Sequence, residues 1–329
     1  LADLAILSDP APDQDKLDAI LGPDVAELAG KVKTAAQMAA EALEQYQAMK
    51  RGFSCELSYM RHVLALSAPG DHIVIACASS VGKTSLGLQV CDRYHTLFVS
   101  GEMPAVNIAR RTHAMEYWRM AETDEVRGMY ADEKDQNLEF HSVMGSGNLE
   151  GLYRDYWLYV TDPVSVPELD RILTANPGMD MVLVDYLQLM KGSGEDRRNQ
   201  MAALARGLKQ LAKAHSVRMV SLCQVSRPQT GNPMTDPATI PVTLARLKES
   251  GDIEESADYV IGMWLHRSRA SGIQAVQDIK NRNAGVHSVA YLKRTGPWFR
   301  DATEAEADAA DEQPYHPPTQ KKGASWSPD

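Results

Sequence analysis

Residues 76–86 read ACASSVGKTSL, which places a lysine and a hydroxyl directly after a glycine, as in a phosphate-binding loop. Backbone N–H groups of such a loop hold phosphate oxygens, the lysine reaches the β- and γ-phosphates, and the next hydroxyl binds Mg²⁺. Cys77 stands where the pattern G-x-x-x-x-G-K-[ST] has its first glycine. The pattern still favours a nucleotide site over a degenerate loop or a chance turn. The predicted phosphate-binding residues are Ser79, Ser80, Val81, Gly82, Lys83, Thr84 and Ser85.

Three polar side chains follow apolar runs, where the carboxyl end of a parallel strand would bring them near the loop. Asp185 ends the run MVLVD and is expected to support Mg²⁺, although an aspartate that caps a loop is the alternative. Glu102 follows FVSG and is placed to polarise a water against the γ-phosphate. Its rival interpretation is a first-turn helix acid that complements the helix dipole. Gln224 could hydrogen-bond the γ-phosphate or be an ordinary polar strand end.

Alternating apolar and amphipathic segments surround these side chains and predict an α/β fold. A continuous apolar run such as the one at 179–190 is typical of a strand in the middle of a parallel sheet. The expected architecture is a mostly parallel central sheet flanked by helices on both faces. Strands are expected at 72–78, 96–103, 155–162, 179–190, 217–226, 259–265, 273–280 and 287–293, and helices at 84–94, 104–121, 165–176 and 199–216.

Composition divides the chain into four parts. Residues 1–23 are rich in Pro and Asp and are expected to form a flexible acidic arm. Residues 24–52 are rich in Ala, Glu, Gln, Met and Leu and predict a helix, which packs either on its own domain or on a neighbouring subunit. Residues 53–300 form the expected α/β domain, and residues 301–329 are expected to be a disordered acidic and Pro-rich tail.

The formal net charge of −10 argues against nucleic-acid binding until the charge is located. Residues 1–30 carry seven acidic side chains and one basic one, and residues 301–329 carry seven and two, so the segment between them is nearly neutral. A neutral segment can still present a local basic surface to phosphates. No apolar run is long enough for a membrane span, no secretory signal is visible, and the four cysteines form no C-x-x-C pair, which indicates reduced thiols in a cytoplasm.

Six segments of the chain form an ordered pattern: ASSVGKTS, FVSGEMPAVNIARR, MVLVDYLQLM, ARGLKQLAKAHSVRMVSLCQVSR, LKESGDIEESADYVI and IKNRNAGVHSVAYL. Together they closely resemble the motor domain of DnaB-type replicative helicases. The resemblance runs in order over roughly residues 30–300, and the segments VDYLQLM and ESGDIEESAD are its most specific parts. It implies a RecA-like P-loop NTPase fold, ATP and Mg²⁺, and a ring, usually a hexamer, that encircles single-stranded DNA in a bacterial or phage-infected cell.

The resemblance assigns further roles. It implies that Lys83 and Thr84 hold phosphate and Mg²⁺, Glu102 is the general base, Asp185 supports the metal, Gln224 senses the γ-phosphate and Arg111 lies near the nucleotide. In IKNRN, it implies that Lys280 and Arg282 reach into the next subunit's site; without the resemblance they read as strand-end surface cations.

Two departures from the family pattern lie close to the site. The family's loop commonly begins with Ala rather than Gly, so Cys77 should fit, and an exposed Cys77 would make the site sensitive to thiol reagents. Gly101 replaces the family's usual Leu, which is expected to loosen the backbone just before Glu102.

The segment LKESG resembles the loop that contacts DNA phosphates inside the ring. Lys248 stands where the family commonly has Arg, and Glu249 and Gly251 complete the predicted DNA-binding set. An ordinary helix-start turn is the alternative. Residues 191–200 form a charged loop that either lines the channel or is simply solvated. No aromatic platform for bases is visible, so DNA contact should be electrostatic, independent of sequence and sensitive to salt.

Three functions stay open at this stage. The preferred one is a ring-forming, ATP-dependent translocase on single-stranded DNA that unwinds duplex DNA during replication. The second is a RecA-like, ATP-switched DNA-binding accessory for loading or recombination, and the third is a ring subunit without catalytic activity. The part of the predicted helix at about 31–50 resembles the family's linker helix, and the roughly 30 residues before it are too few for the family's N-terminal collar, which indicates a trimmed chain or a compact phage or mobile-element variant. The acidic tails could recruit a helicase loader or another replication protein, or only maintain solubility.

Overall fold

The computed structural model describes residues 34–40, 43, 55–120, 157–191, 197–226, 236–269, 271–285 and 288–309. The chain divides into two units, Leu1–Gly52 and Phe53–Asp329. In the first unit, residues 35–40 and 43 are helical, and the side chains of Met38 and Leu43 are exposed. The predicted helix at 24–52 is therefore seen only in this part, and the predicted arm at 1–23 lies outside the described residues.

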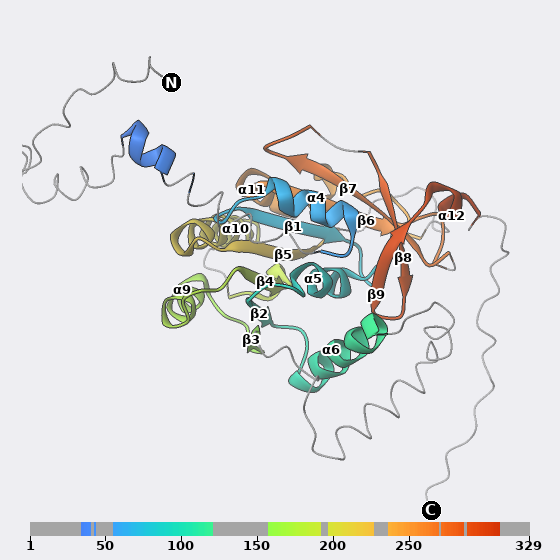
Figure 1. The fold of residues 1–329 in the computed structure, drawn as a ribbon, viewed down its shortest axis with the longest axis horizontal. Coiled ribbons are helices and arrows are strands. Elements are labelled where there is room, and N and C mark those ends of the chain that lie inside the picture. The colour runs from blue at the N-terminus through green and yellow to red at the C-terminus, as the bar shows by residue number, and fades with distance from the viewer. Residues whose placement is uncertain are drawn as a thin grey trace, which may run out of the picture. The chain divides into compact units, whose positions relative to one another are not determined.

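A single sheet of nine strands organises the described part of the second unit (Figure 1). The first six strands in sheet order pair in parallel, and the last three extend the sheet as an antiparallel meander. The order is β3 (Trp157–Val160), β2 (Thr96–Ser100), β4 (Met181–Asp185), β5 (Arg218–Gln224), β1 (His72–Cys77), β6 (Tyr259–Leu265), β7 (Ile273–Asn281), β8 (Ala290–Thr295) and β9 (Trp298–Ala302).

Helices cover both faces of this sheet, as the sequence predicts. Ile73 and Ile75 of β1 belong to a core shared with α4, α5 and α6, whereas Val74 and Ala76 belong to a second core shared with α9 and α10. Alternate residues of a strand point to opposite faces, so one apolar strand supplies both cores. The helices are α4 (Ser58–Leu66), α5 (Lys83–Cys91), α6 (Ala105–Met120), α9 (Val166–Ala175), α10 (Arg197–His215), α11 (Gly251–Ser256) and α12 (Glu304–Ala309), with 3₁₀ turns η2 (Leu187–Leu189) and η3 (Leu244–Ser250).

The C-terminal hairpin β8–β9 differs from the sequence expectation. The prediction that disorder begins at residue 301 is wrong, because β9 runs through Ala302 and α12 follows it. Asp301 accepts hydrogen bonds from the backbone N–H of Ser58, at 3.0 and 3.1 Å, and Arg300 forms an ion pair with Glu306 at 2.6 Å. Strand β9 therefore gains part of its order from Ser58, a partner distant in sequence, which the composition of the tail does not register. Residues 310–329 lie outside the described part.

One glutamine joins this hairpin to helix α5. The side-chain amide of Gln89 donates to the carbonyl of Phe299 at 2.7 Å and accepts from the N–H of Phe299 at 2.9 Å. Gln89 and Phe299 are both buried, so the two hydrogen bonds satisfy peptide groups that water cannot reach. Helix α5 follows the phosphate loop directly, so this contact places the hairpin against the loop.

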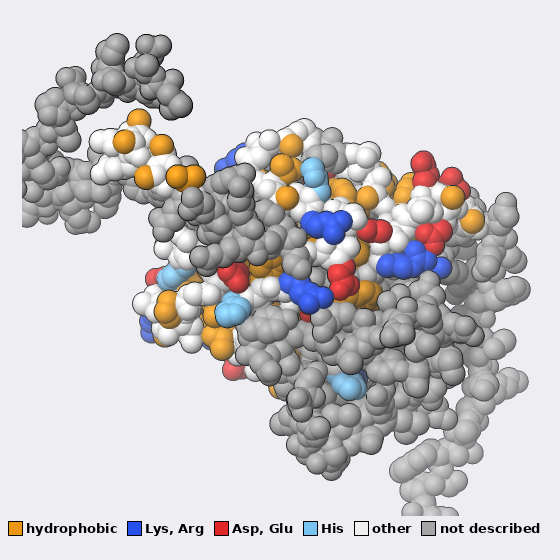
Figure 2. All heavy atoms as spheres, viewed as in Figure 1, with side chains coloured by type: hydrophobic (Ala, Val, Ile, Leu, Met, Phe, Trp, Pro, Cys, Tyr) orange, Lys and Arg blue, Asp and Glu red, His pale blue; other side chains and the backbone are white. Residues whose placement is uncertain are grey.

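On the described part of the face drawn in Figure 2, Lys and Arg side chains lie beside Asp and Glu side chains rather than in one basic field. This agrees with the nearly neutral charge of the segment between the two acidic ends. None of the helices in the described ranges is both long enough and apolar enough to cross a membrane.

We expect Gln89→Ala to lower the free energy of unfolding by about 2 kcal/mol, because it leaves two buried peptide groups of Phe299 without partners. Urea denaturation followed by circular dichroism measures this change. An unchanged unfolding midpoint would show that the hairpin is held by its apolar contacts alone.

Candidate active site

The phosphate loop bends at Ser80 and Gly82, not at Cys77. The backbone φ is 64° at Ser80 and 119° at Gly82, whereas Cys77 is the last residue of strand β1. A Cβ atom at Gly82 would lie 2.7 Å from Cζ of Phe299, so both conformation and space require glycine there. An extended residue needs no such freedom, which explains why cysteine is tolerated where the general pattern has glycine.

Lys83, Thr84 and Asp185 converge at the start of helix α5. The Nζ of Lys83 lies 3.0 Å from one carboxylate oxygen of Asp185, and the Oγ1 of Thr84 donates to the other oxygen at 2.7 Å. Asp185 is fully buried at the end of β4. The Nζ of Lys83 also lies 4.8 Å from the ring centroid of Tyr186, a contact that the sequence analysis did not single out.

Glu102 lies at the mouth of this group, just beyond the end of strand β2. Its side chain is 52 % exposed, and Oε2 is 4.0 Å from the Nζ of Lys83. The N–H of Gly101 donates to the carbonyl of Asp185 at 3.1 Å, which ties this corner to strand β4. A Cβ atom at Gly101 would lie 3.1 Å from Cβ of Leu189. The expected loosening at Gly101 is therefore not seen, because glycine permits a close approach to Leu189.

A cleft of about 320 Å³ opens over the loop. Three predicted residues do not line it. Val81 and Ser85 are buried, and Asp185 lies behind Lys83 and Thr84, which line the cleft and hydrogen-bond to its carboxylate. Eight of the predicted nucleotide-site residues line the cleft: Ser79, Ser80, Gly82, Lys83, Thr84, Glu102, Arg111 and Gln224.

Arg294 of strand β8 also lines the cleft and was missed by the sequence analysis. Burial lowers the pKa of Arg294, and the neighbouring positive charge of Arg111 lowers it further. Among the described residues, no carboxylate forms an ion pair with either arginine. Two cations without counterions at one cleft favour an anionic ligand. No signal within the segment KRTG marks Arg294, because its place depends on the docking of the hairpin.

The donor set at the loop suits a hard cation carried by a ligand. The hydroxyl of Thr84 and the carboxylate of Asp185 are adjacent oxygen groups, which is the chemistry that Mg²⁺ prefers. Within the described ranges, no group of three or more His, Cys, Asp or Glu side chains could hold a metal ion. A Mg²⁺ ion that keeps its waters and binds through phosphates needs only one or two protein oxygens.

Gln224 ends strand β5 beside the loop, at the register position opposite Cys77. Its carbonyl accepts from the side-chain amide of Gln188 at 3.0 Å, and its N–H donates to the same amide group at 3.4 Å. These backbone contacts leave the side chain of Gln224 to line the cleft, as a γ-phosphate sensor requires.

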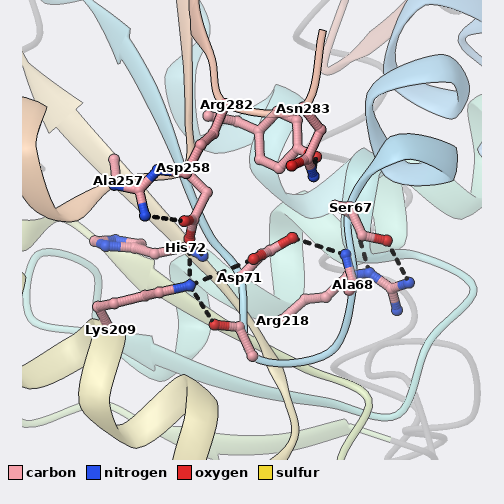
Figure 3. Close-up of polar contacts among 12 residues, drawn as sticks. Ser67, Ala68, Asp71, His72, Lys209, Arg218, Ala257, Asp258, Arg282 and Asn283 are labelled. Carbon is pink, nitrogen blue, oxygen red and sulfur yellow. Dashed lines mark hydrogen bonds and ion pairs between the residues drawn. The ribbon is translucent and has the colours of Figure 1, made fainter. Parts of the chain in front are cut away.

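Lys280 and Arg282 lie at the opposite end of the sheet from the loop. Arg282 forms an ion pair at 3.1 Å with Asp258, which accepts from the N–H of His72 at 2.9 Å and pairs with Lys209 at 2.5 Å (Figure 3). Lys280 donates to the carbonyl of Ala257 at 2.7 Å. Strand β1 runs from His72 to Cys77, so roughly 16 Å of strand separates this cluster from the loop. The structure does not bring these two cations to the cleft of their own chain.

The predicted DNA-binding segment is described in its backbone only. Lys248 and Glu249 belong to the 3₁₀ turn η3, and Gly251 begins helix α11. The side chains of these residues lie outside the described part. The charged loop at 191–200 is likewise described only at Lys191 and from the start of α10 at Arg197.

All four cysteines are buried. Burial raises the pKa of Cys55 and Cys77 to about 12 and that of Cys223 to about 11, and it also raises the pKa of Cys91. Cys77 is therefore not the exposed thiol that a reagent-sensitive site needs.

We expect the folded protein to react slowly with dithionitrobenzoate from pH 7 to pH 9. Only the thiolate attacks, and thiols with raised pKa values stay protonated across this range. All four thiols should react at once in denaturant, which the absorbance of the released thionitrobenzoate measures. One equivalent of rapid reaction in the folded protein would show an accessible cysteine.

The family described as "DnaB-like helicase C terminal domain" matches residues 30–298. The chain is 30 % identical over 242 residues to a replicative DNA helicase DnaB of Pasteurella multocida, covering 70 % of this chain and 48 % of that protein. It is 29 % identical over 233 residues to a probable plasmid replicative DNA helicase of Chlamydia muridarum, covering 67 % of this chain and 48 % of that protein. The chain thus spans about half the length of these curated relatives.

The fold agrees with this match. A solved structure titled "The Structure Of A DnaB-Like Replicative Helicase And Its Interactions With Primase" superimposes with a TM-score of 0.56 at 19 % identity, covering 85 % of this chain and 70 % of that one. This likeness shows a shared fold, a mostly parallel sheet with helices on both faces, in agreement with the RecA-like α/β fold expected from the sequence. The fold, the phosphate loop and the extent of the match lead to one conclusion: the chain belongs to the DnaB-like helicase C-terminal domain family.

Proposed function

We propose that this chain is the motor of a ring-forming, ATP-dependent translocase on single-stranded DNA that unwinds duplex DNA during replication. The observation that carries the proposal is the convergence of Lys83, Thr84, Asp185 and Glu102 at one cleft. Family membership and the names of the relatives, replicative and plasmid replicative DNA helicases, support the same activity. By the same likeness, we place the activity in the cytoplasm of a bacterial or phage-infected cell.

The cleft binds and orients ATP through its own donors. Backbone N–H groups of the loop and the Nζ of Lys83 hold the phosphates, and Arg111 and Arg294 balance their charge. Thr84 and Asp185 present oxygens to Mg²⁺ and its waters. The ion, when bound, neutralises charge that develops on the transferred phosphoryl group. Lys83, now paired with Asp185, exchanges that carboxylate for phosphate oxygens.

Glu102 is placed to orient the attacking water and to accept its proton. It lies on the solvent side of Lys83, so the γ-phosphate that Lys83 holds would lie within reach of a water bound to Glu102. Gln224, at the end of strand β5 beside β1, donates to the same phosphate and registers its loss.

Lys280 and Arg282 act on the cleft of the next subunit. Their position beyond the start of β1 excludes their own cleft, and the side chain of Arg282 is 52 % exposed although it pairs with Asp258. A head-to-tail contact between subunits would set this end of one sheet against the loop end of the next, and repetition of that contact closes a ring, which we take to be a hexamer. A cation supplied by a neighbour stabilises transition-state charge and makes hydrolysis depend on assembly.

Lys248, Glu249 and Gly251 form the proposed contact with DNA phosphates in the ring channel. Binding through a lysine and backbone N–H groups does not read sequence. A helicase loader or another replication protein is the further partner that we propose for the assembled ring.

We expect Lys83→Ala and Arg282→Ala each to lower DNA-stimulated ATP hydrolysis by about a thousandfold, because one removes phosphate binding and the other removes the neighbour's cation. Mixing the two inactive variants in equal amounts should restore activity. About a quarter of the interfaces then join an intact cleft to an intact Arg282. A phosphate-release assay measures the rate, and light scattering in ATP measures the assembly.

Strand displacement on a forked duplex distinguishes the unwinding motor from the ATP-switched DNA-binding accessory. Unwinding by the wild type and none by either variant supports the motor. DNA binding and ATP binding without displacement would favour the ATP-switched accessory. Failure of the mixture to recover activity, with rings of normal size, would show that Arg282 does not act between subunits.

A further inference from the structure

The side chain of Arg246 holds four backbone carbonyls of one chain segment. One terminal nitrogen donates to Ile240 at 2.6 Å and to Pro241 at 3.2 Å. The other donates to Ser226 at 3.4 Å and to Pro237 at 3.3 Å. All four N–H bonds of the two terminal nitrogens are thus used on main-chain oxygens.

This contact is reciprocal, and none of the described carboxylates acts as its counterion. The hydroxyl of Ser226 donates to the carbonyl of Arg246 at 3.0 Å, so the two residues are joined in both directions. No carboxylate of the described residues pairs with Arg246, and burial lowers its pKa. Among the described residues, carbonyl dipoles are what balances the charge of the guanidinium. A planar fork with several fixed donors can span such a set, whereas the single nitrogen of a lysine cannot.

Ser226 is joined to the nucleotide cleft by two residues of chain. Gln224 lines the cleft, and Val225 is buried, with its N–H donating to the carbonyl of Cys77 at 3.0 Å. A second cavity of about 310 Å³ shares Ala78, Ser79 and Gln224 with the nucleotide cleft. Ser226 and Arg246 line this second cavity, so the loop and the Arg246 contact lie on two sides of one space.

The segment at 236–242, whose carbonyls Arg246 contacts, is also attached to the sheet. The carbonyl of Ala238 accepts from the N–H of Leu265 at 2.8 Å, and Val242 packs so closely on Gly262 that a Cβ there would lie 2.9 Å from it. Arg246 and Lys248 belong to the same 3₁₀ turn, η3. Hydrogen bonds of Ser226 and Arg246 therefore connect the end of β5 to the backbone of Lys248, so a shift of the strand end can move that backbone.

We propose that Arg246 is a positioning residue that couples the nucleotide cleft to the DNA-binding segment. The inference rests on the proposed function, because it takes Lys248 as a DNA contact and Gln224 as the γ-phosphate sensor. Arg246 touches neither ligand. Its hydrogen bonds attach turn η3, which carries Lys248, to the chain just after strand β5, which carries Gln224.

The test compares Arg246→Ala and Arg246→Lys with Arg269→Ala in the full chain. Arg269 lines the same cavity but forms an exposed ion pair with Asp236 at 2.7 Å, so it is a matched arginine control. Four quantities are measured for each protein: ATP hydrolysis without DNA, its stimulation by oligo-dT, the salt dependence of oligo-dT binding with and without a non-hydrolysable ATP analogue, and the melting temperature.

We expect Arg246→Ala to keep the DNA-free rate within about twofold and to lose about tenfold in the DNA stimulation ratio and in the nucleotide-dependent gain in DNA affinity. Arg246→Lys should fall between Arg246→Ala and wild type, and Arg269→Ala should match wild type. The salt slope of nucleotide-free binding should not change, because every phosphate contact is still present.

Three results would overturn the inference. Unchanged stimulation in Arg246→Ala would show that no coupling passes through it. A fall in the salt slope of about 0.7 would make Arg246 a direct phosphate contact. Equal losses with and without DNA, together with a lowered melting temperature, would make its role purely structural. A wild type without DNA stimulation would instead refute the proposed function, so the two failures are separable.

Discussion

The parallel pairing of strand β1 with β5 on one side and β6 on the other is the constraint on which the rest of the structure depends. Parallel strands bring their carboxyl ends to one edge, so the loop after Cys77, the carboxylate of Asp185 and the amide of Gln224 meet there without being adjacent in sequence. Both faces of these strands are buried, and the register therefore cannot slip without exposing a core. The geometry of the cleft follows from that register.

The same constraint separates the two halves of the proposed chemistry. The start of β1 carries the cluster of Asp258, Lys209 and Arg282, and the end of β1 carries the phosphate loop. The carboxylate of Asp258 keeps Lys209 and the N–H of His72 as partners if Arg282 leaves it. A rigid sheet cannot fold these ends together. A site that needs both ends must therefore be built from two copies of the chain, which is how a ring can make hydrolysis conditional on assembly.

The antiparallel strands β8 and β9 also shape the cleft. Phe299 packs against Gly82, Gln89 holds the backbone of Phe299, and Arg294 lines the cleft from the neighbouring strand. A segment more than 200 residues distant in sequence thus completes the wall of the phosphate loop. The contact of Arg246 with four carbonyls acts similarly next to the proposed DNA-binding segment, because it holds irregular backbone that the sheet does not pair.

The local pattern of apolar and polar residues in the sequence by itself determined most strands of the central sheet and the phosphate loop. Apolar runs of strand length predicted strands β1 to β8, and the lysine and hydroxyl after Gly82 predicted the phosphate loop, because burial and anion binding leave signals within a few residues. Helix α4, strand β9, helix α12 and the roles of Arg294 and Arg246 were decided only by tertiary structure. Arg294 and Arg246 are ordinary surface types in sequence, and their roles come from partners far along the chain. The apolar residues of α4 and β9, among them Met60 and Phe299, are too few and too widely spaced to show which element they form until they pack on the sheet. Cys77 needed both kinds of information. Its small size fits the loop pattern in the sequence. Only the fold shows that it lies at the extended end of a strand, where glycine has no advantage.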